Sequence, residues 1–296
     1  MRLRELEIDG PPHKVRVAFA DWGPPDAPRT VVCVHGLTRQ GRDFDALARS
    51  LVADGWRVLC PDLPGRGRSQ WLDDPAAYAA PTYVMQVAAL LEGLGLRAVD
   101  FVGTSLGGIV GMGLAAMPDN PIRSLVLNDI GGAIPLHAMA YIAHYIQLRP
   151  RFADLAEAEA YFREIHSGFS DLGDAEWRAM AAHSTRALPE GGYDLGYDPA
   201  IAQAFLTTVG DVELWGLYDT IKMPTLLLRG GDSQLLTAET AAAMTERGPK
   251  AELVTFPGVG HAPGLTRPEQ IEPIVRFLRT APAYEASISA AASSAA

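Results

Sequence analysis

A glycine-rich turn in the first half of the chain reads Val102-Gly103-Thr104-Ser105-Leu106-Gly107-Gly108. It follows an apolar run that begins at Val99 and precedes a helix-like segment, Ile109 to Met117. This is the Gly-x-Ser-x-Gly pattern in its strand–turn–helix context. Such a turn lifts a serine clear of the sheet, and the following helix N-terminus aims its N–H groups at developing negative charge. The pentapeptide also occurs in ordinary turns, but this context predicts that Ser105 is a nucleophile.

Short apolar runs on both sides of this turn predict further strands. They are Lys14 to Ala20, Thr30 to Val34, Arg57 to Cys60, Ser124 to Asn128, Thr225 to Arg229 and Ala251 to Phe256. Helix-length patterns such as Asp43 to Gly55 and Pro81 to Leu94 separate most of them, which indicates an α/β fold with a mostly parallel sheet. Leu3 to Ile8 and Lys14 to Ala20 alternate in polarity, and we expect an antiparallel edge hairpin there.

The alternation of strands and helices stops between about residues 133 and 215. That stretch has four helical patterns and no strand candidate, and its helices are expected near Pro135 and after Asp154, Asp174 and Asp198. We therefore predict a core formed by residues 1–132 and 216–280, with a helical cap inserted as residues 133–215. Residues 281–296 are rich in Ala and Ser and are expected to form a disordered tail.

A second set of motifs supplies partners for the serine. His261 lies in a glycine-rich loop directly after the last predicted strand, which favours it as the general base. The oxyanion formed by serine attack needs two donors, and we expect the N–H groups of Leu106 and Leu37 to serve. Leu37 belongs to the loop after the strand Thr30 to Val34. In the same loop, His35 is expected to support the backbone by hydrogen bonds.

The acid that orients the histidine has two candidates. Asp232 follows the strand Thr225 to Arg229 and has the expected chain order of serine, acid and histidine. Asp129 follows the strand Ser124 to Asn128, and both strands should end at the same edge of the sheet. We prefer Asp232 as the catalytic acid and keep Asp129 as the alternative.

Taken together, these motifs resemble the α/β-hydrolase superfamily from about Lys14 to Leu278. A further marker is the turn Asp62-Leu63-Pro64-Gly65-Arg66-Gly67-Arg68-Ser69. The resemblance implies an eight-stranded sheet with helices on both faces, an inserted helical cap and a Ser-His-Asp triad. Many relatives place the acid nearer Ser233 or Gln234, which keeps Asp129 open. Dehalogenases and epoxide hydrolases resemble the chain in layout but have aspartate at the position of Ser105.

Composition limits the partners and the compartment. The net charge of −10 makes nucleic acid and anionic membranes unfavourable partners. The first residues have no apolar stretch typical of a signal peptide, and no run of eighteen apolar residues occurs. Cys33 and Cys60 lie in strand patterns and are expected to be buried thiols. A cytoplasmic protein is the default expectation, and its oligomeric state stays open.

The sequence thus predicts a serine hydrolase that cleaves small to medium carboxylic esters through an acyl-enzyme on Ser105. This chemistry needs no cofactor or metal, and we expect neither. No arginine cluster indicates a highly anionic substrate. A carbon–carbon bond hydrolase or enol-lactonase, a cofactor-free perhydrolase and a non-catalytic binding protein remain as alternatives on the same fold.

Overall fold

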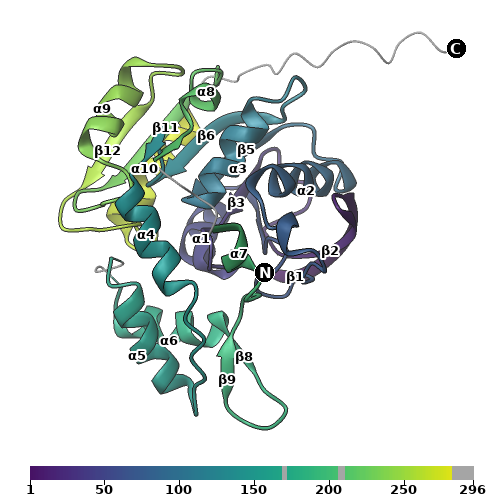
Figure 1. Ribbon diagram of the computed structural model, residues 1–296. Coiled ribbons are helices and arrows are strands. Elements are labelled where there is room, and N and C mark those ends of the chain that lie inside the picture. Colours follow the sequence, from purple (N-terminus) through teal and green to yellow (C-terminus); the bar gives the residue numbers. More distant parts are fainter. Residues whose placement is uncertain (169–171, 206–210, 282–296) are drawn as a thin grey trace, which may run out of the picture.

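The computed structural model describes residues 1–168, 172–205 and 211–281. Its main sheet has eight strands in the order β1-β2-β4-β3-β5-β6-β11-β12 (Figure 1). Their bounds are β1 Arg2–Gly10, β2 His13–Trp22, β3 Thr30–Val34, β4 Arg57–Pro61, β5 Val99–Thr104, β6 Ile122–Asn128, β11 Thr225–Gly230 and β12 Glu252–Phe256. All neighbours pair in parallel except β1 with β2 and β2 with β4. The predicted eight-stranded, mostly parallel sheet is confirmed.

Helices cover both faces of this sheet. One face packs against α1 (Asp45–Ala53) and α10 (Pro268–Thr280), and the other against α2 (Ala80–Gly93), α3 (Leu106–Ala115), α8 (Trp215–Tyr218) and α9 (Ala238–Glu246). Two short 3₁₀ helices, η1 (Gly41–Phe44) and η2 (Pro75–Ala77), lie in the connecting segments. The strand β3 is buried along its whole length, and its side chains alternate between the two core clusters. A continuously apolar strand is expected where helices cover both faces.

The expected edge hairpin is also present. The strands β1 and β2 pair in an antiparallel register that runs from Arg2 opposite Asp21 to Gly10 opposite His13. The turn therefore falls at Pro11 and Pro12, where proline's missing N–H removes no ladder hydrogen bond. The strand β1 lies at one edge of the sheet, far from the central strands β3 and β5 in the strand order.

The segment 133–215 contains the four predicted helices, α4 (Leu136–Tyr145), α5 (Leu155–Ile165), α6 (Asp174–Ser184) and α7 (Ile201–Phe205). The expectation that it holds no strand is wrong. The strands β8 (Thr185–Ala187) and β9 (Tyr193–Leu195) form a hairpin, and β7 (Ala133–Ile134) pairs with β10 (Val212–Glu213). These strands of two or three residues are too short to show an alternating pattern.

The segment 133–215, which we call the inserted segment, contributes no strand to the main sheet in the described residues. Figure 1 shows α5, α6 and the β8–β9 hairpin grouped to one side of that sheet. The β7–β10 pair joins the beginning and the end of the segment. The predicted tail lies outside the described residues from 282 onward. Among the described helices, none has the length and apolar character needed to cross a membrane.

Candidate active site

Ser105 lies at the tip of the predicted turn, between the end of β5 and the first residue of α3. Its φ of 53° and ψ of −116° fall outside the regions that side-chain-bearing residues usually adopt. A Cβ added to Gly103 would lie 2.3 Å from the Gly107 carbonyl oxygen, and one added to Gly107 would lie 1.9 Å from that of Val34. The two glycines therefore let strand and helix approach closely enough to force the serine outward.

His261 joins the serine to a carboxylate. Its Nε2 lies 3.1 Å from Ser105 Oγ, and its Nδ1 lies 2.6 Å from Asp129 Oδ2. Because an ionised carboxylate can only accept, Nδ1 carries the proton in this arrangement, and Nε2 is left to accept from the serine hydroxyl. This geometry is that of a base poised to take the serine proton. The loop after β12 that carries His261 reaches the serine as the sequence indicates.

His261 contacts the alternative candidate for the acid, Asp129, and not the preferred one, Asp232. Asp232 is exposed to solvent, whereas Asp129 is fully buried and contacts His261. Both residues follow neighbouring parallel strands, but Asp129 comes directly after β6 and adopts a positive φ of 54°. Aspartate is one of the few residues that tolerate this conformation. The structure therefore pairs the alternative candidate with the histidine.

The Asp129 carboxylate is held by donors from β11 and the turn after it. The Gly230 N–H donates to Oδ1 at 2.8 Å, and the Ser233 hydroxyl donates to Oδ2 at 2.5 Å. Sequence reasoning missed Ser233. The signal was present, because the resemblance places the acid of many relatives near this position. In this chain the position holds a serine, and its hydroxyl hydrogen-bonds to the carboxylate of Asp129, which follows the neighbouring strand.

Asn128 connects the two loops that carry the serine and the histidine. Its buried Nδ2 donates to Thr104 Oγ1 at 3.0 Å and to the Pro263 carbonyl oxygen at 2.9 Å. Thr104 precedes the serine directly, and Pro263 follows the histidine by two residues. Asn128 therefore fixes the spacing between these loops. The sequence offered no signal for this role beyond the position of Asn128 at the end of a buried strand.

The loop expected to supply an oxyanion donor lies beside the serine. A Cβ added to Gly36 would lie 3.6 Å from Ser105 Cβ, so the backbone leading to Leu37 passes close to the nucleophile. Leu106 is the first residue of α3. Across the described residues, neither the Leu37 N–H nor the Leu106 N–H donates to a protein acceptor. Both groups thus have unused donor capacity.

His35 supports this loop, as expected. Its Nδ1 donates to the Gly36 carbonyl oxygen at 2.7 Å, and its Nε2 accepts from the Leu63 N–H at 2.9 Å. Burial lowers the pKa of His35 to about 3, so the ring stays neutral at ordinary pH. A neutral ring fits this pattern, since one nitrogen donates and the other accepts.

The inserted segment contacts the loop that carries the base. The Gly260 N–H donates to the Gly168 carbonyl oxygen at 3.0 Å, and the His166 ring stacks on Phe162 with centroids 5.9 Å apart. Burial lowers the pKa of His166, and the nearby Arg39 and His261 side chains lower it further. Tyr145 lies beside His166, with ring centroids 5.9 Å apart. These contacts place α4 and α5 near the serine and histidine.

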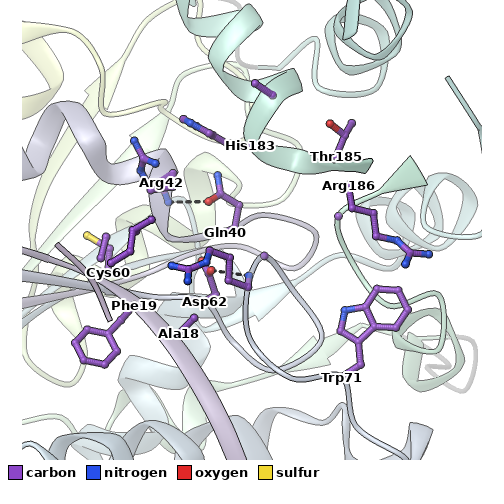
Figure 2. Close-up of a pocket in the computed structure, with 16 residues that line it drawn as sticks. Ala18, Phe19, Gln40, Arg42, Cys60, Asp62, Trp71, His183, Thr185 and Arg186 are labelled. Carbon is purple, nitrogen blue, oxygen red and sulfur yellow. Dashed lines mark hydrogen bonds between the residues drawn. The ribbon is translucent and has the colours of Figure 1, made fainter. Parts of the chain in front are cut away.

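Two cavities border the inserted segment. One of about 340 Å³ lies between the strands β2 and β4 and the end of α6, and its lining includes Asp62, His183 and Trp71 (Figure 2). Ser105, Asp129 and His261 are absent from its described lining. The other, of about 320 Å³, is lined by Gly36, Thr104 and Pro263 among others. It therefore adjoins the residues that flank the serine and the histidine.

No group of three or more His, Cys, Asp or Glu side chains in the described parts of the chain could hold a metal ion. Cys33 and Cys60 are free and buried, as expected. The arrangement of serine, histidine and buried aspartate, with two unused backbone donors nearby, is suited to nucleophilic attack on a carbonyl carbon.

Comparisons with known proteins support ester hydrolysis in general. The chain is 41% identical to a 3-hydroxybutyrate-oligomer hydrolase of Cupriavidus necator, over 91% of this chain and 95% of that protein. It is 30% identical to an esterase of Mycobacterium tuberculosis, over 86% and 83% of the two chains. The structure of an alpha/beta hydrolase from Novosphingobium aromaticivorans superimposes with a TM-score of 0.84 at 35% identity, over 94% of this chain and 98% of that one. A profile of the Alpha/beta hydrolase family matches residues 31–274, and the chain is a member of this family.

Proposed function

We propose that this protein is a serine hydrolase that cleaves carboxylic esters through an acyl-enzyme on Ser105. The observation that carries the proposal is the continuous hydrogen-bonded line from Ser105 Oγ through the His261 ring to the Asp129 carboxylate, at 3.1 and 2.6 Å. A buried carboxylate on one ring nitrogen holds the other nitrogen as an acceptor facing the hydroxyl. The similarity to ester-hydrolysing enzymes supports ester hydrolysis in general.

In the first half of the reaction, His261 Nε2 takes the Ser105 proton as the oxygen attacks the ester carbonyl carbon. The C=O double bond opens to a tetrahedral oxyanion, which the Leu37 and Leu106 N–H groups stabilise. The imidazolium then gives its proton to the leaving alcohol, and the C–O bond breaks. Asp129 stabilises the imidazolium throughout and keeps its own charge. In the second half, His261 activates water, and the acyl group leaves as the carboxylic acid.

We assign the inserted segment the role of a cap over this site. The contact between Gly260 and Gly168 and the ring contacts of His166 support this assignment, because they bring the segment against the base loop. Tyr145 adds a partly buried phenol beside the oxyanion loop. Burial raises the pKa of Tyr145 to about 12, against the opposing effect of its hydrogen bond with Thr38, so the phenol stays neutral.

For the substrate, we propose esters of small to medium size, including short oligoesters of 3-hydroxy acids. The similarity to the 3-hydroxybutyrate-oligomer hydrolase supports this class. The free, buried thiols of Cys33 and Cys60 support the cytoplasm as the compartment, since a disulfide is not used in this part of the fold. Small molecules remain the expected partners.

The test is hydrolysis of a p-nitrophenyl ester series from acetate to decanoate by the wild type and by Ser105→Ala. We expect activity that is highest for short acyl chains and is lost in the variant, with a pre-steady-state burst of p-nitrophenol in the wild type. Mass spectrometry of the quenched enzyme should show the acyl group on the peptide that contains Ser105.

Two outcomes would overturn the proposal. Wild-type activity that persists in Ser105→Ala would exclude the acyl-enzyme on this residue. A wild type that cleaves no ester of the series would move the protein to carbon–carbon bond hydrolysis, enol-lactone hydrolysis or binding without catalysis. Assays with a vinylogous diketone, an enol-lactone and a perhydrolysis substrate would then separate those alternatives.

A further inference from the structure

Arg39 is a buried cation with one unused edge. Its side chain is 5% exposed, and its Nε and Nη2 donate to the two oxygens of Asp43, at 2.7 Å each. This fork uses one edge of the planar guanidinium. In the described part of the chain, its buried Nη1 has no hydrogen-bond partner. Buried donors without partners are rare in folded proteins, and each calls for an explanation.

A second unpaired donor belongs to the loop beyond the histidine. Thr266 Oγ1 is buried and has no partner among the described residues. Arg39 and Thr266 both line the cavity of about 320 Å³ whose lining also includes Thr104 and Pro263. Two unpaired polar groups in the lining of one cavity indicate that the cavity receives a polar ligand rather than an apolar chain.

The cavity is lined by Gly36, whose backbone lies beside the nucleophile. A Cβ added to Gly36 would be 3.6 Å from Ser105 Cβ and 3.7 Å from Arg39 Cγ, so one backbone position separates the two side chains. The cavity is also lined by Thr104 and Pro263, which flank Ser105 and His261 in the sequence. Arg39 therefore belongs to the same loop region that passes beside the serine, although Ser105 and His261 are not among the described lining residues of the cavity.

The other charged groups of the cavity already have partners or reach solvent. Arg42 pairs with Asp45, Arg49 is exposed, and Glu176 lies 3.8 Å from an Arg267 nitrogen. Burial lowers the pKa of His183, so this ring is neutral at ordinary pH. Positive and negative side chains thus balance in number around the cavity. Selectivity for an anion must then come from the free edge of the Arg39 guanidinium and not from the net charge of the lining.

We propose that Arg39 and Thr266 bind a free carboxylate of the substrate, and that the cavity holds the carboxylate-bearing unit of a hydroxy-acid oligoester. The inference rests on the proposed function. A guanidinium edge matches the two oxygens of a carboxylate, and a hydroxyl donor can complete the set. The free carboxylate of such an ester belongs to the alcohol portion. Arg39 therefore holds the leaving group, which departs as a hydroxy acid once His261 has protonated it.

The experiment compares two substrates that differ only in their terminal group. One is the linear dimer of 3-hydroxybutyrate with its free carboxylate, and the other is the same dimer with a terminal carboxamide. The variants are Arg39→Lys, which keeps a charge beside Asp43 but loses the fork, and Thr266→Val, which removes the hydroxyl. Arg163→Lys is the control, because Arg163 also forms an i,i+4 pair, with Glu159, and is not among the residues that line this cavity.

We expect Arg39→Lys to lower kcat/KM for the free acid by about tenfold or more, mainly through KM. The carboxamide and p-nitrophenyl acetate should change by less than about threefold, since neither presents a carboxylate to the cavity. Thr266→Val should also lower kcat/KM for the free acid more than for the other two substrates, but by a smaller factor. Arg163→Lys should match the wild type on all three substrates. Equal losses on acid and carboxamide would overturn the inference and make Arg39 a purely structural residue.

Binding separates this inference from the proposed function. Calorimetric titration of the Ser105→Ala protein with the dimer acid should give a Kd at least about tenfold lower than with the carboxamide, and Arg39→Lys in that background should remove the difference. Equal affinity for the two compounds would contradict the carboxylate site even if esters are cleaved. Absence of turnover with a retained preference for the acid would refute the proposed function alone.

Discussion

Asp129 Oδ2 lies 2.6 Å from His261 Nδ1, although the two residues are 132 positions apart in the sequence. The parallel pairing of β6 with β11 explains how Asp129 reaches this place. Leu228 is the register partner of Asn128, so the chain leaves both strands at the same edge of the sheet. The Asp129 N–H donates to the Leu228 carbonyl oxygen at 2.8 Å, which continues the pairing by one residue. The backbone of Asp129, and with it the carboxylate, is therefore held in place by the sheet and not only by the contact with His261.

Exchange of the two candidate acids for asparagine tests this relationship. We expect Asp129→Asn to reduce kcat for p-nitrophenyl esters by about three to four orders of magnitude, because an amide cannot hold the imidazole in the required tautomer. Asp232→Asn should stay within about twofold of the wild type, since the Asp232 side chain is exposed. Circular dichroism of both variants checks their folding. A larger loss in Asp232→Asn would return the catalytic role to that residue.

Ser233 should act through Asp129. We expect Ser233→Ala to lower kcat several-fold at constant KM, and to reduce the free energy of unfolding by about 1.5–3 kcal/mol, because a hydrogen bond to a buried carboxylate is lost. Ser184→Ala is the matched control, because its buried hydroxyl has no partner in the described structure. Steady-state kinetics and urea unfolding of both variants provide the comparison. Similar kcat values for Ser233→Ala and wild type would show that Ser233 does not position the acid.

The sequence predicted those parts of the site whose local backbone demands particular residues. The turn at Ser105 needs glycine on both sides, and the sequence shows this directly because Gly103 and Gly107 each lie two residues from the serine. His261 was recognisable from its place in a glycine-rich loop after the last strand. The central strands followed from apolar runs, since a strand buried on both faces carries a distinct composition, and the edge hairpin followed from alternating polarity.

The parts that could not be predicted depend on which side chains meet in space. Asp129 and Asp232 follow neighbouring strands, and their separation into a buried and an exposed residue depends on the backbone conformation of Asp129. The burial of Arg39 depends on the packing of the inserted segment over its loop, which leaves no periodic signal. The β8–β9 hairpin was missed because three residues per strand carry too little pattern.

The glycines around the nucleophile are predicted to be indispensable for folding. We expect Gly107→Ala to reduce the free energy of unfolding by about 3 kcal/mol or more, because its Cβ would lie 1.9 Å from a backbone oxygen that cannot move without shifting β3. Gly216→Ala is the control, since a Cβ there meets nothing within 4 Å. Thermal and urea unfolding measure both effects. Similar stabilities of the two variants would disprove the close packing of strand β5, helix α3 and strand β3.

The neutral, buried ring of His35 predicts a decrease in stability at acid pH. Its folded pKa of about 3 lies below the unfolded value of 6.5. Between these values the unfolded chain binds a proton that the folded chain does not, so stability falls as the pH is lowered through this window. Above about pH 6.5 the ring is neutral in both states, and below about pH 3 it is protonated in both. The contribution is at most about 1.4 kcal/mol per pH unit.

The variant His35→Gln isolates this contribution, because an amide keeps one donor and one acceptor but does not titrate. We expect the free energy of unfolding of the wild type to fall more steeply between about pH 6 and pH 4 than that of the variant, by roughly 1 kcal/mol per pH unit. Other titrating groups affect both proteins equally and cancel in the difference. Urea unfolding at several pH values measures it, and parallel curves would mean that His35 is protonated in the folded protein. A protonated ring could no longer accept from the Leu63 N–H, and the loop that contains Leu37 would then need another support.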